Sequence, residues 1–121
     1  MTDVVVIGAG IAGLTAALRL ARAGRAVTLV SFGTGGLVLG QGTVDVLGYA
    51  PDRVRRPLDA LAGWVADHPD HPYATLGPDA VRDGVAFLAD AVGPDLLVGD
   101  PEQNVWLPTA VGAVRPTCLV Q

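Results

Sequence analysis

The sequence predicts an α/β fold that opens on a parallel strand, helix, strand unit, and three observations carry this prediction. Val4–Ile7 is an unbroken apolar run rich in β-branched residues, typical of a parallel strand buried on both faces. Between residues 14 and 21, apolar side chains recur at helical spacing. Gly24 can end that helix in a left-handed conformation, and residues 26–30 then resume a strand.

A glycine-rich turn joins the first predicted strand to the helix, and it reads Gly8-Ala9-Gly10-Ile11-Ala12-Gly13. In such a turn the first glycine permits the tight bend, the second lets the backbone approach a pyrophosphate, and the third allows close packing of helix on strand. Unpaired N–H groups and the positive end of the helix dipole would meet the phosphate charge. These six residues are therefore the predicted cofactor-binding turn of a Rossmann-like FAD/NAD(P)-binding domain, and the alternative is a unit whose glycines only serve packing.

The end of the second predicted strand departs from the usual pattern. An acidic residue there normally bonds the adenosine ribose, but this chain has Ser31, which cannot form a charge-assisted pair. No arginine occurs between Arg25 and Arg53 to bind a 2′-phosphate, so NADP is not expected. Ser31 remains a candidate cofactor contact.

Residues 33–48 are too rich in glycine for a predicted helix. They leave the second strand where such folds bind their ligand, so we expect the amides of Gly35 and Gly36 and the hydroxyl of Thr43 to contact the cofactor. A mobile loop is the alternative. Asp45 is expected to be a cap or turn residue, and the alternative is a buried polar contact near the cofactor.

The middle of the chain predicts two helices joined by a loop with two histidines. The first helix is predicted from Pro51 to Asp67 and the second from Pro78 to Val92. Prolines follow both His68 and His71, so extended backbone is expected there. No third ligand is apparent, so no metal site is predicted. An acid or base role for either histidine stays open.

The last segment predicts a short antiparallel β-meander, with strands at 96–98, at 105–107 and from 114 onward. Arg115 alternates with apolar neighbours on the last strand. Its side chain is predicted either to be solvated or to bind an anionic substrate group bidentately.

The predicted parts divide the chain into three segments. Residues 1–50 hold the βαβ unit and the glycine-rich cofactor loop, residues 51–95 a helical insertion, and residues 96–121 the start of the meander. Two parallel strands are too few for a doubly wound sheet, so the Rossmann-like domain is predicted to be incomplete. We expect an N-terminal part of a longer protein, or one gene of a split pair.

The composition indicates which binding partners and which cellular compartment to expect. The chain has 8 basic and 12 acidic residues, which argues against nucleic acid or an anionic membrane as a partner. Its single cysteine cannot form an internal disulfide, and its first residues do not resemble a signal peptide. The expected location is cytoplasmic, without direct membrane insertion, and any peripheral contact with the cell membrane would come through a partner protein.

Four segments together resemble the B subunit of anaerobic glycerol-3-phosphate dehydrogenase, a flavoprotein related to the fumarate reductase and aspartate oxidase flavoproteins. They are V-V-V-I-G-A-G-I-A-G-L at 4–14, G-Q-G-T-V-D-V-L at 40–47, D-H-P-Y-A-T-L at 70–76 and L-P-T-A-V-G-A-V-R-P-T at 107–117. The resemblance covers nearly the whole chain, and its last two motifs are the most discriminating.

The resemblance implies a flavin-dependent oxidoreductase subunit that oxidises sn-glycerol 3-phosphate to dihydroxyacetone phosphate and passes electrons to a quinone. It implies a flavin, FMN or FAD, and FMN would suit Ser31 because FMN has no adenosine. The implied partners are a catalytic FAD subunit, an iron–sulfur membrane-anchoring subunit and a phosphate-bearing small-molecule substrate. No catalytic base can be assigned, and this fragment alone is expected to be inactive. The alternatives are a non-catalytic flavin-binding electron-transfer or assembly subunit, and another fumarate reductase-like FAD oxidoreductase.

Overall fold

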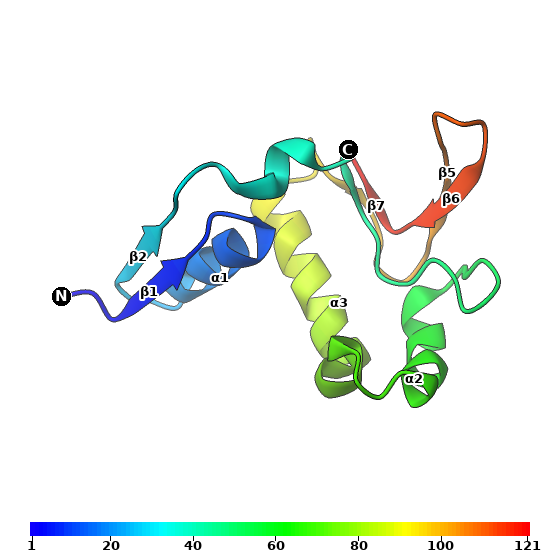
Figure 1. The fold of residues 1–121 in the computed structure, drawn as a ribbon, viewed down its shortest axis with the longest axis horizontal. Helices are drawn as coiled ribbons and strands as arrows, with labels where there is room; N and C mark the ends of the chain where they lie inside the picture. The colour runs from blue at the N-terminus through cyan, green and yellow to red at the C-terminus, as the bar shows by residue number, and fades with distance from the viewer. The chain divides into compact units, whose positions relative to one another are not determined.

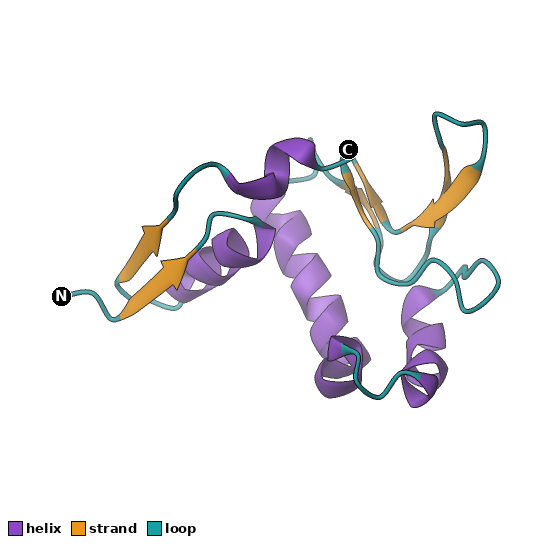
Figure 2. Cartoon of the chain, in the orientation of Figure 1, coloured by secondary structure: helices purple, strands orange, loops and turns teal.

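The computed structural model describes all residues from 1 to 121, which form two compact units, Met1–Gln41 and Gly42–Gln121. Helices and short strands occur in both units (Figure 2), which confirms the predicted mixed α/β class. The predicted division at residues 50 and 95 stays a prediction.

The first unit opens with the predicted strand, helix and strand: β1 (Val4–Ile7), α1 (Ile11–Arg22) and β2 (Val27–Val30). The two strands are parallel and in register from the Val4–Val27 pair to the Ile7–Val30 pair. The crossover helix α1 lies against this two-stranded sheet (Figure 1). At its end Gly24 has φ +77°, so the predicted left-handed helix end is confirmed.

The predicted burial of the first strand on both faces is wrong for this chain. Val4 and Val6 are half-buried, but Val5 and Ile7, on the other face, are 57% and 84% exposed. Val30, which pairs with Ile7, is 49% exposed. Within the first unit a single helix packs on the sheet, so only one of its two faces is covered.

A short 3₁₀ helix, η1 (Gly35–Leu39), forms in the loop where the sequence predicted no helix. Gly40 N–H closes it on the carbonyl of Leu37 at 3.0 Å. A single tight turn fixes few residues, so the entropy that disfavours glycine in a long helix weighs little here.

The second unit combines two helices with short strands. Its helices are α2 (Pro57–Asp67) and α3 (Pro72–Val92), which pack on each other. Its strands are β3 (Thr43–Val44), β4 (Val98–Gly99), β5 (Val105–Pro108), β6 (Val114–Thr117) and β7 (Leu119–Val120). Buried apolar side chains from both helices and from the strand segments form one core: Val46, Leu47, Leu58, Leu61, Val81, Val85, Cys118 and Leu119.

The first predicted helix of this unit begins later than expected, at Pro57 rather than Pro51. The preceding residues form a turn, in which Tyr49 and Arg53 make an isolated antiparallel bridge. The helix starts where proline takes a first-turn position, one residue before the buried Leu58.

The second predicted helix begins earlier than expected, at Pro72, and is broken at Gly77, whose φ is +75°. The segment from Pro78 therefore starts where the sequence predicted. The extended backbone predicted before these prolines is confirmed at His71, which has φ −75° and ψ 140°. Pro72 then takes the first turn of α3, which the His71 side chain caps.

The strands of the predicted meander are antiparallel, but they do not pair in chain order as a meander would. β4 pairs with β7, which lies between β3 and β4, whereas β5 pairs with β6 as a separate hairpin. The strand predicted at 96–98 is observed at 98–99. No helix of the chain combines the length and the apolar composition needed to cross a membrane.

Candidate functional site

The predicted cofactor turn leads into α1, whose first amides have no capping side chain. Gly8 has φ +104° and its N–H donates to the carbonyl of Val30 at 2.8 Å, which ties the turn to the end of β2. Gly10 is the N-cap of α1, and neither a side-chain cap nor an acidic first-turn residue is present. The first amides of α1 are therefore available to an anion, together with the positive end of the helix dipole.

The glycines of this turn are of two kinds. A Cβ added at Gly10 would meet no heavy atom within 4 Å, whereas a Cβ at Gly13 would lie 2.0 Å from the carbonyl oxygen of Gly8. Gly13 is thus required by the close approach of helix and strand. Gly10 borders open space, so the turn has both the donors and the room that a diphosphate needs.

The glycine-rich loop after β2 packs against the Gly8–Gly13 turn. A Cβ at Gly35 would lie 2.5 Å from the Ala9 oxygen and 2.8 Å from the Gly10 nitrogen, and Gly35 has φ +68°. Only glycine allows this backbone-to-backbone approach. A Cβ at the next residue, Gly36, would meet nothing within 4 Å. The first unit therefore brings Gly35, together with its neighbour Gly36, to the predicted phosphate turn.

Ser31 uses its hydroxyl within its own turn. The hydroxyl donates to the carbonyl of Gly33 and accepts from the Gly33 N–H. This local turn bends the chain as it leaves β2, just ahead of Gly35. The hydroxyl thus has a structural role in the loop.

The other two candidate residues, Thr43 and Arg115, meet each other in the second unit. The guanidinium of Arg115 donates to Thr43 Oγ1 at 2.5 Å and to Asp45 Oδ2 at 2.6 Å. Asp45 is therefore one half of an ion pair, not the cap or turn residue that the sequence predicted. The pair is only partly exposed, at 23% for the Arg115 side chain and 36% for Asp45.

Cys118 lies in the core beside this pair and is a free, fully buried thiol. Burial raises the pKa of Cys118 to about 11, and the negative charge of Asp45 adds to the shift. Its Sγ donates to the Val44 carbonyl at 3.0 Å. Cys118 is thus a protonated core residue rather than a nucleophile.

Both histidines make structural contacts. His68 stacks on Trp64 with ring centroids 4.0 Å apart, and its Nδ1 lies 2.8 Å from the Trp64 carbonyl oxygen. His71 caps α3 by accepting the Tyr73 N–H at 3.2 Å. Tyr73 is a packing residue, because its ring lies against the core and its hydroxyl donates to the Val46 carbonyl. No three metal-ligating side chains gather within residues 1–121.

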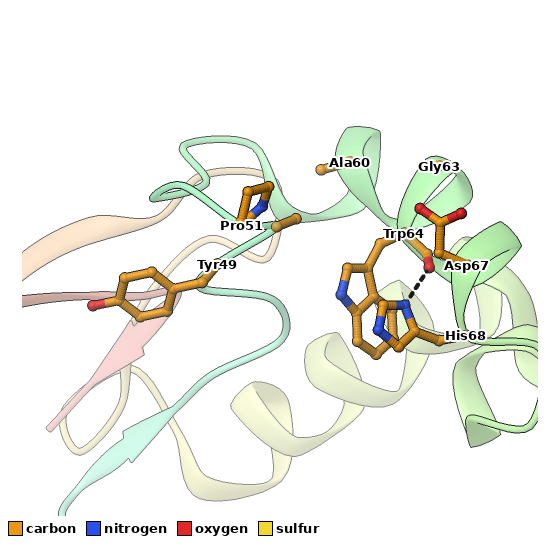
Figure 3. A pocket seen from close by; sticks show the side chains of 8 residues that line it. Tyr49, Pro51, Ala60, Gly63, Trp64, Asp67 and His68 are labelled. Carbon is orange, nitrogen blue, oxygen red and sulfur yellow. Dashed lines mark hydrogen bonds between the residues drawn. The ribbon is translucent and has the colours of Figure 1, made fainter.

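One feature of the second unit has no counterpart in the sequence prediction. The loop after β3 and the helix α2 line an open hollow of about 490 Å³ (Figure 3). Its lining residues are Tyr49, Ala50, Pro51, Ala60, Gly63, Trp64, Asp67 and His68. The sequence carried only a weak sign of it, the small residues of α2 beside Trp64.

Residues 3–121 match the FAD binding domain family. Among curated proteins, the chain is 43% identical to the B subunit of a probable anaerobic glycerol-3-phosphate dehydrogenase from Halobacterium salinarum, over 96% of this chain and 27% of that protein. It is 40% identical to the B subunit of the anaerobic glycerol-3-phosphate dehydrogenase from Pectobacterium atrosepticum, over 93% of this chain and 28% of that protein. For the corresponding protein of Vibrio vulnificus the identity is 36%, over 98% of this chain and 28% of that protein. The chain thus spans little more than a quarter of these relatives, and no solved structure matches it.

Proposed function

Because the chain belongs to the FAD binding domain family, we propose that its first unit is the start of a Rossmann-like domain that holds the diphosphate of FAD. The family match supports a flavin cofactor, FAD. When bound, the flavin supplies the redox chemistry of hydride transfer. The residues of this chain bind and orient it.

The uncapped N-terminus of α1 is the observation that carries this proposal. It has no side-chain cap, and Gly10 borders open space beside it. Residues 8–13 would then bind the diphosphate through main-chain N–H groups and the helix dipole. The amides of Gly35 and Gly36 would reach the phosphates from the loop that lies against the turn.

Ser31 would contribute indirectly to binding the adenosine side of FAD. Its hydroxyl already bonds the backbone of Gly33, so it would shape the loop that presents Gly35. The ribose would then be held without the carboxylate that the motif usually supplies.

For the protein to which this chain corresponds, we propose a flavin-dependent oxidoreductase subunit that oxidises sn-glycerol 3-phosphate to dihydroxyacetone phosphate. The names of the relatives support this reaction, and their designation as B subunits supports the presence of partner proteins. Those partners would be an FAD-bearing catalytic subunit and an iron–sulfur subunit that passes electrons to a quinone at the membrane. The activity would need residues beyond the matched span, since this chain covers little more than a quarter of each relative.

Arg115 would bind the phosphate of the substrate. A guanidinium has five N–H donors, and the contacts with Asp45 and Thr43 engage two of its nitrogens. Thr43, proposed from the sequence as a cofactor contact, would then hold the orientation of Arg115. In the absence of substrate phosphate, the carboxylate of Asp45 would neutralise the charge of the Arg115 guanidinium.

The direct test is cofactor analysis of the intact protein purified from its native gene. We expect visible flavin absorbance, and chromatography of the released cofactor should identify FAD. Apoprotein that takes up no flavin would overturn the proposal for residues 8–13. Flavin that is bound without any turnover of glycerol 3-phosphate, with the partner proteins present, would overturn only the proposed reaction.

A further inference from the structure

The hollow beside α2 has a wall of small residues. Ala60 and Gly63 face it from the helix, and a Cβ at Gly63 would meet nothing within 4 Å. Pro51 faces it from the loop on the opposite side, whereas the ring of Tyr49 points away from Trp64 (Figure 3). The small residues Ala60 and Gly63 leave the space open beside Trp64, between two segments of the same unit.

An aromatic surface is held in place at this hollow. Trp64 is half-buried, stacks on His68 at 4.0 Å and meets the edge of His71 at 4.8 Å. A planar ligand would find a ring already immobilised on one side, so little side-chain entropy would be lost on binding.

Two polar side chains lie beside the aromatic ring. The Trp64 carbonyl can only accept, so the Nδ1 of His68 carries a hydrogen and donates to it. The carboxylate of Asp67 adds a negative charge, and it makes no ion pair within the chain. The chain as a whole carries a net charge of −4.

We propose that this hollow binds a guanidinium group, presented by an arginine side chain or by a free guanidino compound. A guanidinium is planar, so it can stack on Trp64, and its N–H fork can donate to the carboxylate of Asp67. An ammonium lacks the plane, an anion would be repelled by Asp67, and a neutral apolar ligand would gain nothing from that carboxylate. The proposal is independent of the flavin site, since all lining residues belong to the second unit.

Nuclear magnetic resonance titration of the isotope-labelled 121-residue chain tests the proposal, with Val5→Thr and Ile7→Thr introduced on the exposed sheet face of the first unit to keep the chain monomeric. The probes are N-acetylarginine amide, methylguanidinium and the neutral isostere N-acetylcitrulline amide. We expect saturable shifts of the Trp64 indole and His68 ring signals with both cations and none with the citrulline derivative. Trp106, on β5, is the internal control that should not shift. Equal responses to arginine and citrulline derivatives, or no saturable shift, would overturn the proposal.

The two cationic probes also distinguish the source of the guanidinium. Tighter binding of N-acetylarginine amide supports a peptide arginine as the occupant, because its amide groups then add contacts. Equal binding of the two cations supports a free guanidino compound. Both results retain the guanidinium site.

Three variants sharpen the test. Asp67→Asn should weaken arginine binding about fivefold, the size expected for one exposed charge pair. Gly63→Gln should fill the hollow and abolish the shifts. Gly84→Gln is the matched control, because Gly84 is also helical and a Cβ there would meet nothing within 4 Å. Unchanged affinity in Asp67→Asn, or binding retained in Gly63→Gln, would contradict the assignment.

Discussion

At the residue scale, Gly10 and Gly13 lie in the same turn, but an added methyl group has different consequences at the two positions. At Gly10 the backbone has φ −75° and ψ 174°, which any residue adopts, and the space beside it is open. At Gly13 the methyl carbon would overlap the Gly8 carbonyl. One position is thus available for a ligand, whereas the other is closed by the fold itself.

We therefore predict that Gly10→Ala separates cofactor binding from stability. The free energy of unfolding of the 121-residue chain should change by less than about 0.5 kcal/mol. Flavin occupancy of the intact protein should fall sharply, because the methyl group occupies the approach to the phosphate. Denaturant unfolding and the ratio of flavin to protein absorbance measure the two effects.

Gly13→Ala is the companion variant with the opposite pattern. It should destabilise the first unit by about 1–3 kcal/mol, the usual cost of forcing a methyl group into a packed contact. Circular dichroism during denaturant unfolding measures this loss. Full flavin occupancy in Gly10→Ala, or a Gly13→Ala variant as stable as the parent, would contradict the two roles.

A second prediction at this scale concerns alkaline pH. The pKa of Cys118 rises from 9.0 to about 11 on folding, because the thiol is buried. The folded chain therefore retains a proton that the unfolded chain releases. The resulting stabilisation, about 3 kcal/mol, should be complete below pH 9 and lost as the pH approaches 11.

Tryptophan fluorescence during denaturant unfolding measures this effect, because both tryptophans, Trp64 and Trp106, lie in the second unit. Cys118→Ala should flatten the pH dependence. Part of it should remain, since burial also raises the pKa of Tyr73, in the same direction. A Cys118→Ala chain with the same alkaline loss as the parent would contradict the assignment.

At the element scale, the loop between β3 and α2 is held by one buried side chain. Asn104 is 3% exposed, and its Nδ2 donates to the Leu47 and Val54 carbonyls at 2.9 and 2.8 Å. Its backbone N–H donates to the Arg55 carbonyl at 2.8 Å. These bonds, from a residue far along the chain, explain why residues 51–56 form a turn and α2 starts only at Pro57.

We predict that Asn104→Asp destabilises the second unit by about 2–4 kcal/mol. The substitution keeps the side-chain size but places carboxylate oxygens opposite two carbonyl oxygens in a buried position. Gln103→Glu, at the exposed neighbouring residue, adds the same charge and should change stability by less than about 0.5 kcal/mol. Equal effects of the two variants in denaturant unfolding would show that charge, not the buried amide, is responsible.

At the scale of the whole molecule, the first unit exposes one apolar face of its sheet. Val5, Ile7 and Val30 are all about half exposed or more and share that face. Phe32, Val38 and Leu39 in the following loop are 76% exposed or more. Such an apolar surface favours association.

We predict that the isolated 121-residue chain binds a hydrophobic dye and self-associates as its concentration rises. The double variant Val5→Thr, Ile7→Thr should reduce both properties, because threonine keeps the strand propensity while adding a hydroxyl. Light scattering and dye fluorescence measure the change. Ala12→Thr, at an exposed position on α1, is the control that should leave association as in the parent. A monodisperse parent chain without dye binding would contradict the prediction.

The parts of the fold that could be predicted are those whose causes lie close together in the sequence. β1 has the bounds expected from its apolar run, and Gly24 ends α1 as its position indicated. The start of α2 could not be predicted, because it depends on Asn104. The order of the shortest strands could not be predicted either, since strands such as β3 and β7 are too short to carry much pairing information.

The sequence by itself determined the opening turn, because apolar periodicity and the conformational freedom of glycine act over a few neighbouring residues. Only the tertiary structure decided which distant groups meet: Gly35 against the Ala9–Gly10 backbone, Arg115 with Asp45, and the loop facing Trp64 across the hollow. Arg115 and Asp45 are 70 residues apart. Their contact follows from chain packing and strand pairing over long sequence separations, which local propensity does not encode.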